Sequence, residues 1–286
     1  MSTVTTPESA VARWRAMVAA HHAQSERLRD LDWRPAHGVA APSVESFRAD
    51  RGREDDTRII DALRRIVPPQ GTFVDVGAGA GRFTIPLGRD VARVVAVEPN
   101  ESMRQALQRD VQRAGLTNVE IIGTRWETAS GVTGDVVLAA HVVYPILEIA
   151  AFLQRLDAAA RRCAAVVVFE APPLSWLFGF WPRVYGEERL PPPHLPQVID
   201  VVTELGFGPP EVELIEVEPF ELGPPEIARQ KLRRRLYVAP ETPADRRLAA
   251  AMDELLESRE GILVPRTDRP LRVGLVRWQP TQAHAR

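Results

Sequence analysis

Apolar residues follow two alternating patterns from residue 72 onward. Short runs that are apolar almost throughout alternate with longer segments in which apolar residues recur every three or four positions. Continuous apolar runs are typical of strands that are covered on both faces of a sheet, and their alternation with helices predicts a doubly wound, mostly parallel α/β sheet. The predicted strands are Thr72–Val76, Ala92–Val97, Val119–Ile122, Asp135–Ala140, Ala164–Phe169, Val212–Val217 and Leu271–Trp278.

Segments with helical periodicity lie between these apolar runs and also before the first of them. Asp55 and Asp56 are candidate caps for the second of two N-terminal helices. We therefore expect an N-terminal helical cap over 1–57, a core over 58–222 plus 270–286, and a helical insertion over 223–269 that acts as a lid. The predicted helices are 9–31, the helix after Asp56, Arg82–Arg89, Ser102–Arg113, Ile149–Arg162, Leu195–Leu205, Glu226–Leu236 and Ala244–Leu256.

Composition narrows the class of protein. The chain has 286 residues, 45% of them hydrophobic and 26% charged, which is typical of a globular protein. Its net charge of −2 does not favour a nucleic-acid partner. The single cysteine, Cys163, excludes an internal disulfide and a cysteine-based zinc site. With no apolar run long enough to span a membrane and no signal-peptide pattern, the sequence indicates a cytoplasmic protein and gives no sign of a metal site.

A glycine-rich loop follows the first predicted strand. It contains Gly77, Gly79 and Gly81, and Asp75 precedes it. Glycines let the backbone turn tightly and approach a ligand, and the following helix offers free N–H groups. The dinucleotide pattern G-x-G-x-x-G would need a glycine where this chain has Arg82. An acid at position 75 would also repel a pyrophosphate, whereas it would attract an ammonium or sulfonium group.

The loop resembles motif I of the class I S-adenosylmethionine-dependent methyltransferases, and Val97–Met103 resembles their second motif. The resemblance implies that S-adenosylmethionine is the cofactor and that the glycine turn wraps its methionine part, with Asp75 near the amino group. Glu98 would accept hydrogen bonds from the ribose hydroxyls, and Pro99 and Met103 would flank the adenine. It also implies a Rossmann-like sheet with strand order 3-2-1-4-5-7-6 and an antiparallel seventh strand.

The stretch after the third strand departs from the common Gly-Asp-Ala form of that family. It reads Thr124–Glu127 and contains Trp126. In the family this stretch lines the adenine. Trp126 therefore either stacks on the base or closes the hydrophobic core.

Candidate acceptor-side residues follow the fourth and fifth strands. Ligands of parallel sheets bind outside the carboxyl ends of the strands, so His141, Tyr144 and Glu170 are expected near the methyl-transfer site. His141 is a weak candidate for a general base. We favour the alternative that it orders the loop or the methionine part, because methyl transfer from a sulfonium needs little beyond alignment.

The sequence leaves the roles of two further segments open. Five aromatic residues, Trp181 among them, lie between positions 176 and 185. They wall an apolar acceptor pocket, or they serve helix packing or the interface of a homodimer. The insertion is locally basic and can hold an anionic acceptor or RNA phosphates, although a solvated helix face is the reading we favour. Its basic residues are Arg229, Lys231, Arg233, Arg234 and Arg235.

These patterns favour an enzyme that moves a methyl group from S-adenosylmethionine to a small-molecule acceptor by direct displacement. No Asn-Pro-Pro-Tyr motif follows the fourth strand, which disfavours methylation of nucleobases or glutamine. One alternative is a non-catalytic module that binds S-adenosylmethionine and uses its lid for a partner. A less favoured alternative is an NAD-type oxidoreductase.

Overall fold

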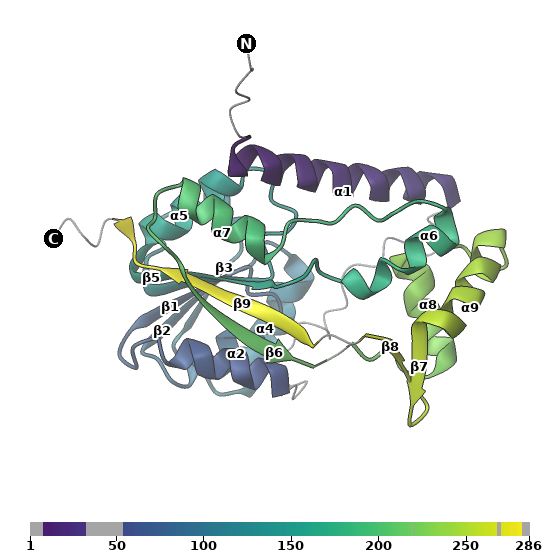
Figure 1. Ribbon diagram of the computed structural model, residues 1–286. Coiled ribbons are helices and arrows are strands. Elements are labelled where there is room, and N and C mark those ends of the chain that lie inside the picture. The colour runs from purple at the N-terminus through teal and green to yellow at the C-terminus, as the bar shows by residue number, and fades with distance from the viewer. Residues whose placement is uncertain (1–7, 33–53, 219, 268–269, 282–286) are drawn as a thin grey trace, which may run out of the picture.

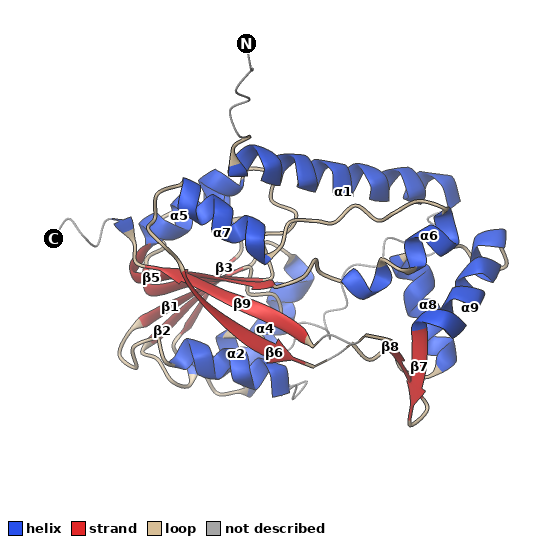
Figure 2. Cartoon of the chain, in the orientation of Figure 1, coloured by secondary structure: helices blue, strands red, loops and turns tan. Residues whose placement is uncertain are grey.

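The computed structural model describes residues 8–32, 54–218, 220–267 and 270–281, and a seven-stranded sheet forms its centre (Figures 1 and 2). The strand order is β3-β2-β1-β4-β5-β9-β6, and β9 runs antiparallel to both of its neighbours. The predicted fold class and strand order are confirmed. The strands are β1 (Thr72–Val76), β2 (Arg93–Val97), β3 (Val119–Ile122), β4 (Gly134–Ala140), β5 (Ala160–Phe169), β6 (Glu211–Val217) and β9 (Leu271–Trp278).

Helices cover both faces of this sheet because side chains alternate between the faces along each strand. Val74 and Val76 pack toward α1, α5 and α7, whereas Phe73 packs toward α2 and α3. None of the helices within the described residues is both long and apolar enough to cross a membrane. The helices around the sheet are α1 (Ala10–Asp32), α2 (Glu54–Arg64), α3 (Thr84–Gly88), α4 (Glu101–Arg113), the short η4 (Trp126–Thr128), α5 (Ile149–Ala159) and α7 (Leu195–Glu204).

The N-terminal helix α1 lies across the top of the sheet's helical layer in Figure 1. Trp14 is fully buried there, and its Nε1 donates a hydrogen bond to the carbonyl of Ile146 at 2.7 Å. The next helix, α2, begins at Glu54, so the predicted caps Asp55 and Asp56 lie inside its first turn. Much of the proposed cap over 1–57 lies outside the described residues.

A second hydrophobic core lies beside the sheet, on the right in Figure 1. It joins the end of α1, through Leu28, to the segment after β5 and to the insertion between β6 and β9. The insertion therefore packs on parts of the chain that are far away in sequence. The elements of this core are η5 (Ser175–Leu177), α6 (Phe180–Tyr185), α8 (Pro225–Arg235), α9 (Pro243–Leu255), β7 (Leu256–Arg259) and β8 (Ile262–Pro265).

The structure corrects several predicted boundaries. The helix predicted over Ile149–Arg162 ends at Ala159, because β5 begins at the next residue and pairs with β4. The helix predicted over Arg82–Arg89 is the shorter α3. The sequence also gave no sign of helix α6 or of the β7–β8 hairpin, whose turn places Glu260 and Gly261 at φ of 51° and 82°.

Candidate functional site

The glycine loop between β1 and α3 needs glycine for two physical reasons. Gly77, Gly79 and Gly81 have φ of 73°, 56° and 96°, a region that side chains strongly disfavour. A Cβ atom on Gly77 would lie 2.5 Å from a methyl carbon of Val142, and one on Gly81 would lie 2.7 Å from a methyl carbon of Leu107. The loop is thus tightly turned and in close contact with its surroundings.

Glu98 lies at the end of β2 and is only 6% exposed. Its Oε2 accepts a hydrogen bond from the backbone N–H of Gly79, and its Oε1 accepts one from that of Asn100, each at 2.8 Å. Asn100 in turn caps α4, with its side chain accepting from the N–H of Met103. Asparagine is a common N-cap, so Asn100 is a residue that the sequence could have revealed. The Glu98 carboxylate therefore ties the glycine loop to the start of α4.

Asp75 lies beneath the glycine loop and is only 1% exposed. Thr84, a residue that the sequence analysis did not single out, donates a hydrogen bond from Oγ1 to Asp75 Oδ2 at 2.7 Å. Burial raises the pKa of Asp75 to about 6, and the nearby charge of Glu98 contributes in the same direction. Two acidic side chains thus lie close to the loop, which favours a cationic ligand group over an anionic one.

The residues predicted around the adenine differ in their surroundings. Pro99 is exposed directly after Glu98, and Met103 is buried against Ala80 of the glycine loop. Trp126 is only 4% exposed and packs in the main core, with the guanidinium of Arg155 5.3 Å from its ring centroid. This position agrees with the core-closing reading of Trp126. Adenine contacts by Pro99 and Met103 stay a prediction.

The loop between β4 and α5 carries His141 and Tyr144. Their side chains meet, with His141 Nδ1 3.2 Å from the Tyr144 hydroxyl oxygen, which also accepts a hydrogen bond from the N–H of Phe169 at 2.9 Å. Burial lowers the pKa of His141 to about 3, with a smaller effect from the charge of Arg82. The imidazole is therefore neutral at physiological pH and accepts the hydrogen bond that the Tyr144 hydroxyl donates. A group with this pKa is a poor general base.

This loop also lines a cavity of about 620 Å³, through Tyr144 and Pro145. Three parts of the chain that are distant in sequence form its wall together with the loop: helix α1, the segment from 173 to 192, and the end of α8 with the turn after it. His21 and His22, which fall off the apolar stripe of α1 in the sequence, lie on this wall. The lining residues are His21, His22, Ser25, Glu26, Tyr144, Pro145, Pro173, Leu174, Leu177, Phe178, Trp181, Arg189, Pro192, Arg235 and Tyr237.

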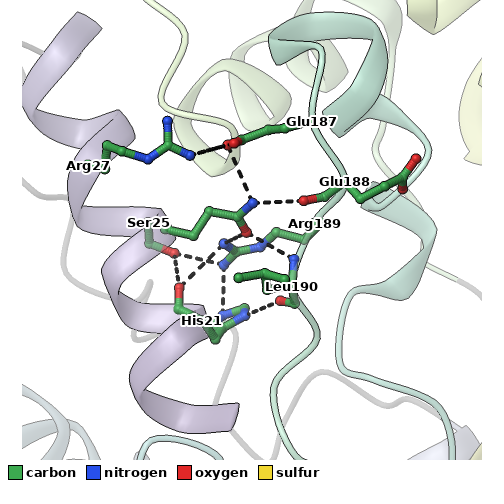
Figure 3. A network of polar contacts seen from close by, with 8 residues as sticks. His21, Ser25, Arg27, Glu187, Glu188, Arg189 and Leu190 are labelled. Carbon is green, nitrogen blue, oxygen red and sulfur yellow. Dashed lines mark hydrogen bonds and ion pairs between the residues drawn. The ribbon is translucent and has the colours of Figure 1, made fainter. Parts of the chain in front are cut away.

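Hydrogen bonds from Arg189 hold helix α1 in place, and α1 forms one side of this cavity (Figure 3). Its guanidinium donates hydrogen bonds to Gln24 Oε1 and Ser25 Oγ, both at 2.7 Å, and to His21 Nε2 at 2.8 Å. His21 Nδ1 donates to the carbonyl of Leu190 at 2.8 Å. Burial lowers the pKa of His21 to about 4, so the imidazole is neutral and can accept from Arg189 while it donates to Leu190.

Trp181 belongs both to the second core and to the wall of the cavity. It is 2% exposed and packs in the second core, and it also lines the cavity, with the guanidinium of Arg189 4.4 Å from its ring centroid. Phe178 lines the cavity as well, whereas Phe180 is fully buried in the second core. The segment is thus part cavity wall and part helix packing.

Glu170 lies apart from the cavity, although it follows the end of β5. Its two carboxylate oxygens accept from Arg272 Nε and Nη2 at 2.8 and 2.9 Å, and it is not among the cavity-lining residues. This pair joins β5 to β9. Within the part of the chain that is described, Glu170 therefore has a structural partner and no contact that supports its predicted place beside the acceptor.

The comparisons with known proteins agree with this geometry. Residues 73–166 match the model of a methyltransferase domain. The chain is 34% identical over 97 residues to the ubiquinone biosynthesis O-methyltransferase of Methylocella silvestris, and 40% identical over 53 residues to a tRNA/tmRNA (uracil-C(5))-methyltransferase of Nitratiruptor. These alignments cover 33% and 18% of this chain and 35% and 15% of the two relatives, so the chain matches only a part of each.

The matched segment contains the glycine loop, Glu98 and the β4–α5 loop, which together define the predicted cofactor side. Residues 73–166 are a domain of the class I S-adenosylmethionine-dependent methyltransferase family.

Solved structures show the same fold for this methyltransferase domain and its surroundings. A putative methyltransferase from Bacillus halodurans aligns with a TM-score of 0.53 at 13% identity, over 77% of this chain and 98% of its own. The magnesium protoporphyrin IX methyltransferase of Synechocystis aligns with a TM-score of 0.51 at 11% identity, over 95% of this chain and all of its own. At these identities the likeness establishes the fold alone.

Proposed function

We propose that this chain transfers a methyl group from S-adenosylmethionine to a small-molecule acceptor in the 620 Å³ cavity, by direct displacement. One structural relationship carries the proposal. Val142 packs against Gly77 of the glycine loop, and Tyr144 and Pro145, two and three residues further on, line the cavity. The β4–α5 loop therefore lies between the glycine loop and the cavity. It contacts the glycine loop through Val142 and lines the cavity with Tyr144 and Pro145.

The residues of the glycine loop fit S-adenosylmethionine in chemistry. Three glycines with positive φ let the backbone approach the ligand, and the carboxylates of Asp75 and Glu98 suit its ammonium and sulfonium charges. Glu98 would hold the ribose, and Met103 with Pro99 would hold the adenine. The bound cofactor supplies an electrophilic methyl group. The carboxylate of Asp75 argues against NAD, whose pyrophosphate is anionic, whereas an acid at the position of Glu98 also occurs in NAD sites and does not discriminate.

The chain's own contribution is to bind, orient and exclude water. Helix α1 is fixed over the cavity by Arg189, and Trp181, whose ring lies against that guanidinium, joins the same part of the wall to the second core. Such enclosure aligns an acceptor and keeps water from the reactive methyl group. His141, neutral and bonded to Tyr144, orients the β4–α5 loop rather than taking a proton.

We infer a small acceptor in the cytoplasm rather than a nucleic acid. The chain's charge of −2 supplies no general attraction for phosphates. Two of the basic residues of the insertion, Arg229 and Arg233, are bound to Asp245 at 2.9 and 2.6 Å. A single cysteine suits a reducing compartment. A homodimer stays a prediction, which light scattering on the purified protein would test.

The test is transfer of a radioactive methyl group. Purified protein is incubated with methyl-labelled S-adenosylmethionine and a low-molecular-weight cell extract, and the Gly79→Val variant serves as the control. The proposal expects label in a small product with the natural protein only. Cofactor binding without any transfer would instead favour a non-catalytic binding module.

A further inference from the structure

Arg235, the last residue of α8, borders the cavity, and no ion pair joins it to an acidic side chain of the described residues. Its Nη1 is buried and has no hydrogen-bond partner among the described residues. Its guanidinium lies 5.8 Å from the ring centroid of Trp176, which is an aromatic contact and not a counter-ion. Burial lowers the pKa of Arg235, and the charge of Arg234 adds to this effect. The side chain is therefore a cation that the fold does not neutralise.

Two other arginines of this helix are neutralised by an acidic partner. Arg229 and Arg233, one turn apart on α8, both bind the carboxylate of Asp245. Arg189, which also lines the cavity, donates to several neutral acceptors of α1. Burying part of a cation without an acidic partner costs free energy, so its presence in a cavity wall points to a bound anion.

The rest of the cavity wall fits the apolar part of such a ligand. Leu174, Leu177, Phe178 and Trp181 supply aliphatic and aromatic surface. The indole N–H of Trp181 is also buried without a partner in the part of the chain that is described. Glu26 is the one carboxylate among the described residues that line the cavity, and it is exposed. The wall thus offers hydrogen-bond donors and apolar surface together.

We propose that the methyl acceptor is an apolar organic acid whose anionic group binds Arg235. Its apolar body would lie against Trp181 and the side chains beside it. A guanidinium binds a carboxylate through two parallel hydrogen bonds, which would also fix the orientation of the acceptor. That this ligand is an acceptor rests on the proposed function, whereas the organic-acid site rests on the cavity alone.

Two fluorescent probes of similar shape test the site. 1-Anilinonaphthalene-8-sulfonate is anionic, and N-phenyl-1-naphthylamine is its neutral counterpart. Each is titrated into the natural protein, into Arg235→Met and into Arg234→Met, where Arg234 is the exposed neighbour. We expect Arg235→Met to weaken binding of the anionic probe roughly 10- to 100-fold and to leave the neutral probe unchanged. Arg234→Met should change neither. An equal loss for both probes, or no loss, would overturn the proposal.

The midpoint of thermal unfolding gives a second test. A binding role and a structural role of Arg235 predict opposite changes in it. Methionine keeps a long apolar side chain beside Trp176 but removes the unpaired charge, so Arg235→Met should raise the unfolding midpoint of the ligand-free protein. A lower midpoint, or failure to fold, would show that Arg235 is a structural residue. Calorimetry with S-adenosylmethionine on the same samples separates the two claims. Absent cofactor binding would overturn the proposed function and leave the organic-acid site to the probe result.

Discussion

The carboxylate of Glu98 accepts a hydrogen bond from the backbone N–H of Gly79 at 2.8 Å. This contact joins the two segments that resemble the cofactor motifs of the methyltransferase family, one from the end of β2 and one from the loop after β1. The charge of Glu98 therefore lies at the centre of the proposed cofactor site.

Replacing Glu98 by glutamine should weaken binding of S-adenosylmethionine roughly 10- to 100-fold, because charge-assisted hydrogen bonds contribute about 1.5–3 kcal/mol. The fold should persist, since the amide oxygen still accepts one of the two backbone N–H groups that Glu98 binds and only the other loses its acceptor. Calorimetry measures the affinity. Glu101→Gln is the matched control, because Glu101 is 65% exposed and pairs with Arg104. Equal affinity of the Glu98→Gln variant and the natural protein would remove Glu98 from the site.

Asp75→Asn should stabilise the ligand-free protein at pH 8. The folded pKa of Asp75 is raised to about 6 from 3.8, so the folded state holds the proton more tightly and stability rises as pH falls through this window. Above pH 6 the buried charge is unfavourable, and its removal should contribute about 3 kcal/mol. Urea unfolding at pH 8 and pH 4 measures the difference, which should be small at pH 4. A variant that is less stable at pH 8 would contradict this account of Asp75.

The same variant should bind S-adenosylmethionine more weakly, because it removes a negative charge near the glycine loop. Stabilisation and loss of affinity are thus expected together. Thr84→Val is the comparison. It removes the hydrogen bond to Asp75 but keeps the charge, so it should lower stability and have the smaller effect on affinity.

His141→Asn should leave the pH dependence of methyl transfer unchanged between pH 6 and 8. The pKa of His141 is lowered to about 3, so the imidazole does not change its charge in this range. Asparagine tolerates the positive φ of 58° at this position and keeps a hydrogen-bonding side chain. We expect a moderate fall in rate, within about tenfold. An inflection near pH 6.5 in the natural enzyme that disappears in the variant would make His141 a general base after all.

His21→Asn should make stability less sensitive to acid. The folded pKa of His21 is about 4, below its ordinary 6.5, so between these values the unfolded chain binds a proton that the folded chain does not. Stability therefore falls as pH falls through this range, and His21 should account for on the order of 1–3 kcal/mol of that loss. Urea unfolding at pH 7 and pH 4.5 tests this. His22→Asn, at the neighbouring position, should follow the natural protein. A parallel loss in both variants would show that His21 is not the group responsible.

The sheet could be predicted from sequence because its strands are buried on both faces and read as continuous apolar runs. The predicted bounds of β1, β3 and β9 agree with the structure. The start of β5 was missed because Arg161 and Arg162 are exposed there and read as the polar end of a helix. The β7–β8 hairpin was missed because its turn is Glu260-Gly261, and glutamate is not the asparagine or aspartate that usually marks such turns.

The cavity could not be predicted in the same way. Its wall combines His21 from α1, Tyr144 from the β4–α5 loop and Arg235 from α8, and no local pattern connects these positions. The sequence also could not distinguish Arg235 from the other basic residues of the insertion. That distinction depends on Asp245, which lies within reach of Arg229 and Arg233.

The central claim is that the loop containing Gly79 holds S-adenosylmethionine, and calorimetric titration tests it most directly. S-adenosylmethionine and NAD are each titrated into the natural protein and into Gly79→Val, since a β-branched side chain is strongly disfavoured at φ of 56°. The account predicts saturable binding of S-adenosylmethionine to the natural protein, none to the variant, and no binding of NAD to either. Binding of NAD, or unchanged S-adenosylmethionine affinity in a folded Gly79→Val variant, would contradict it.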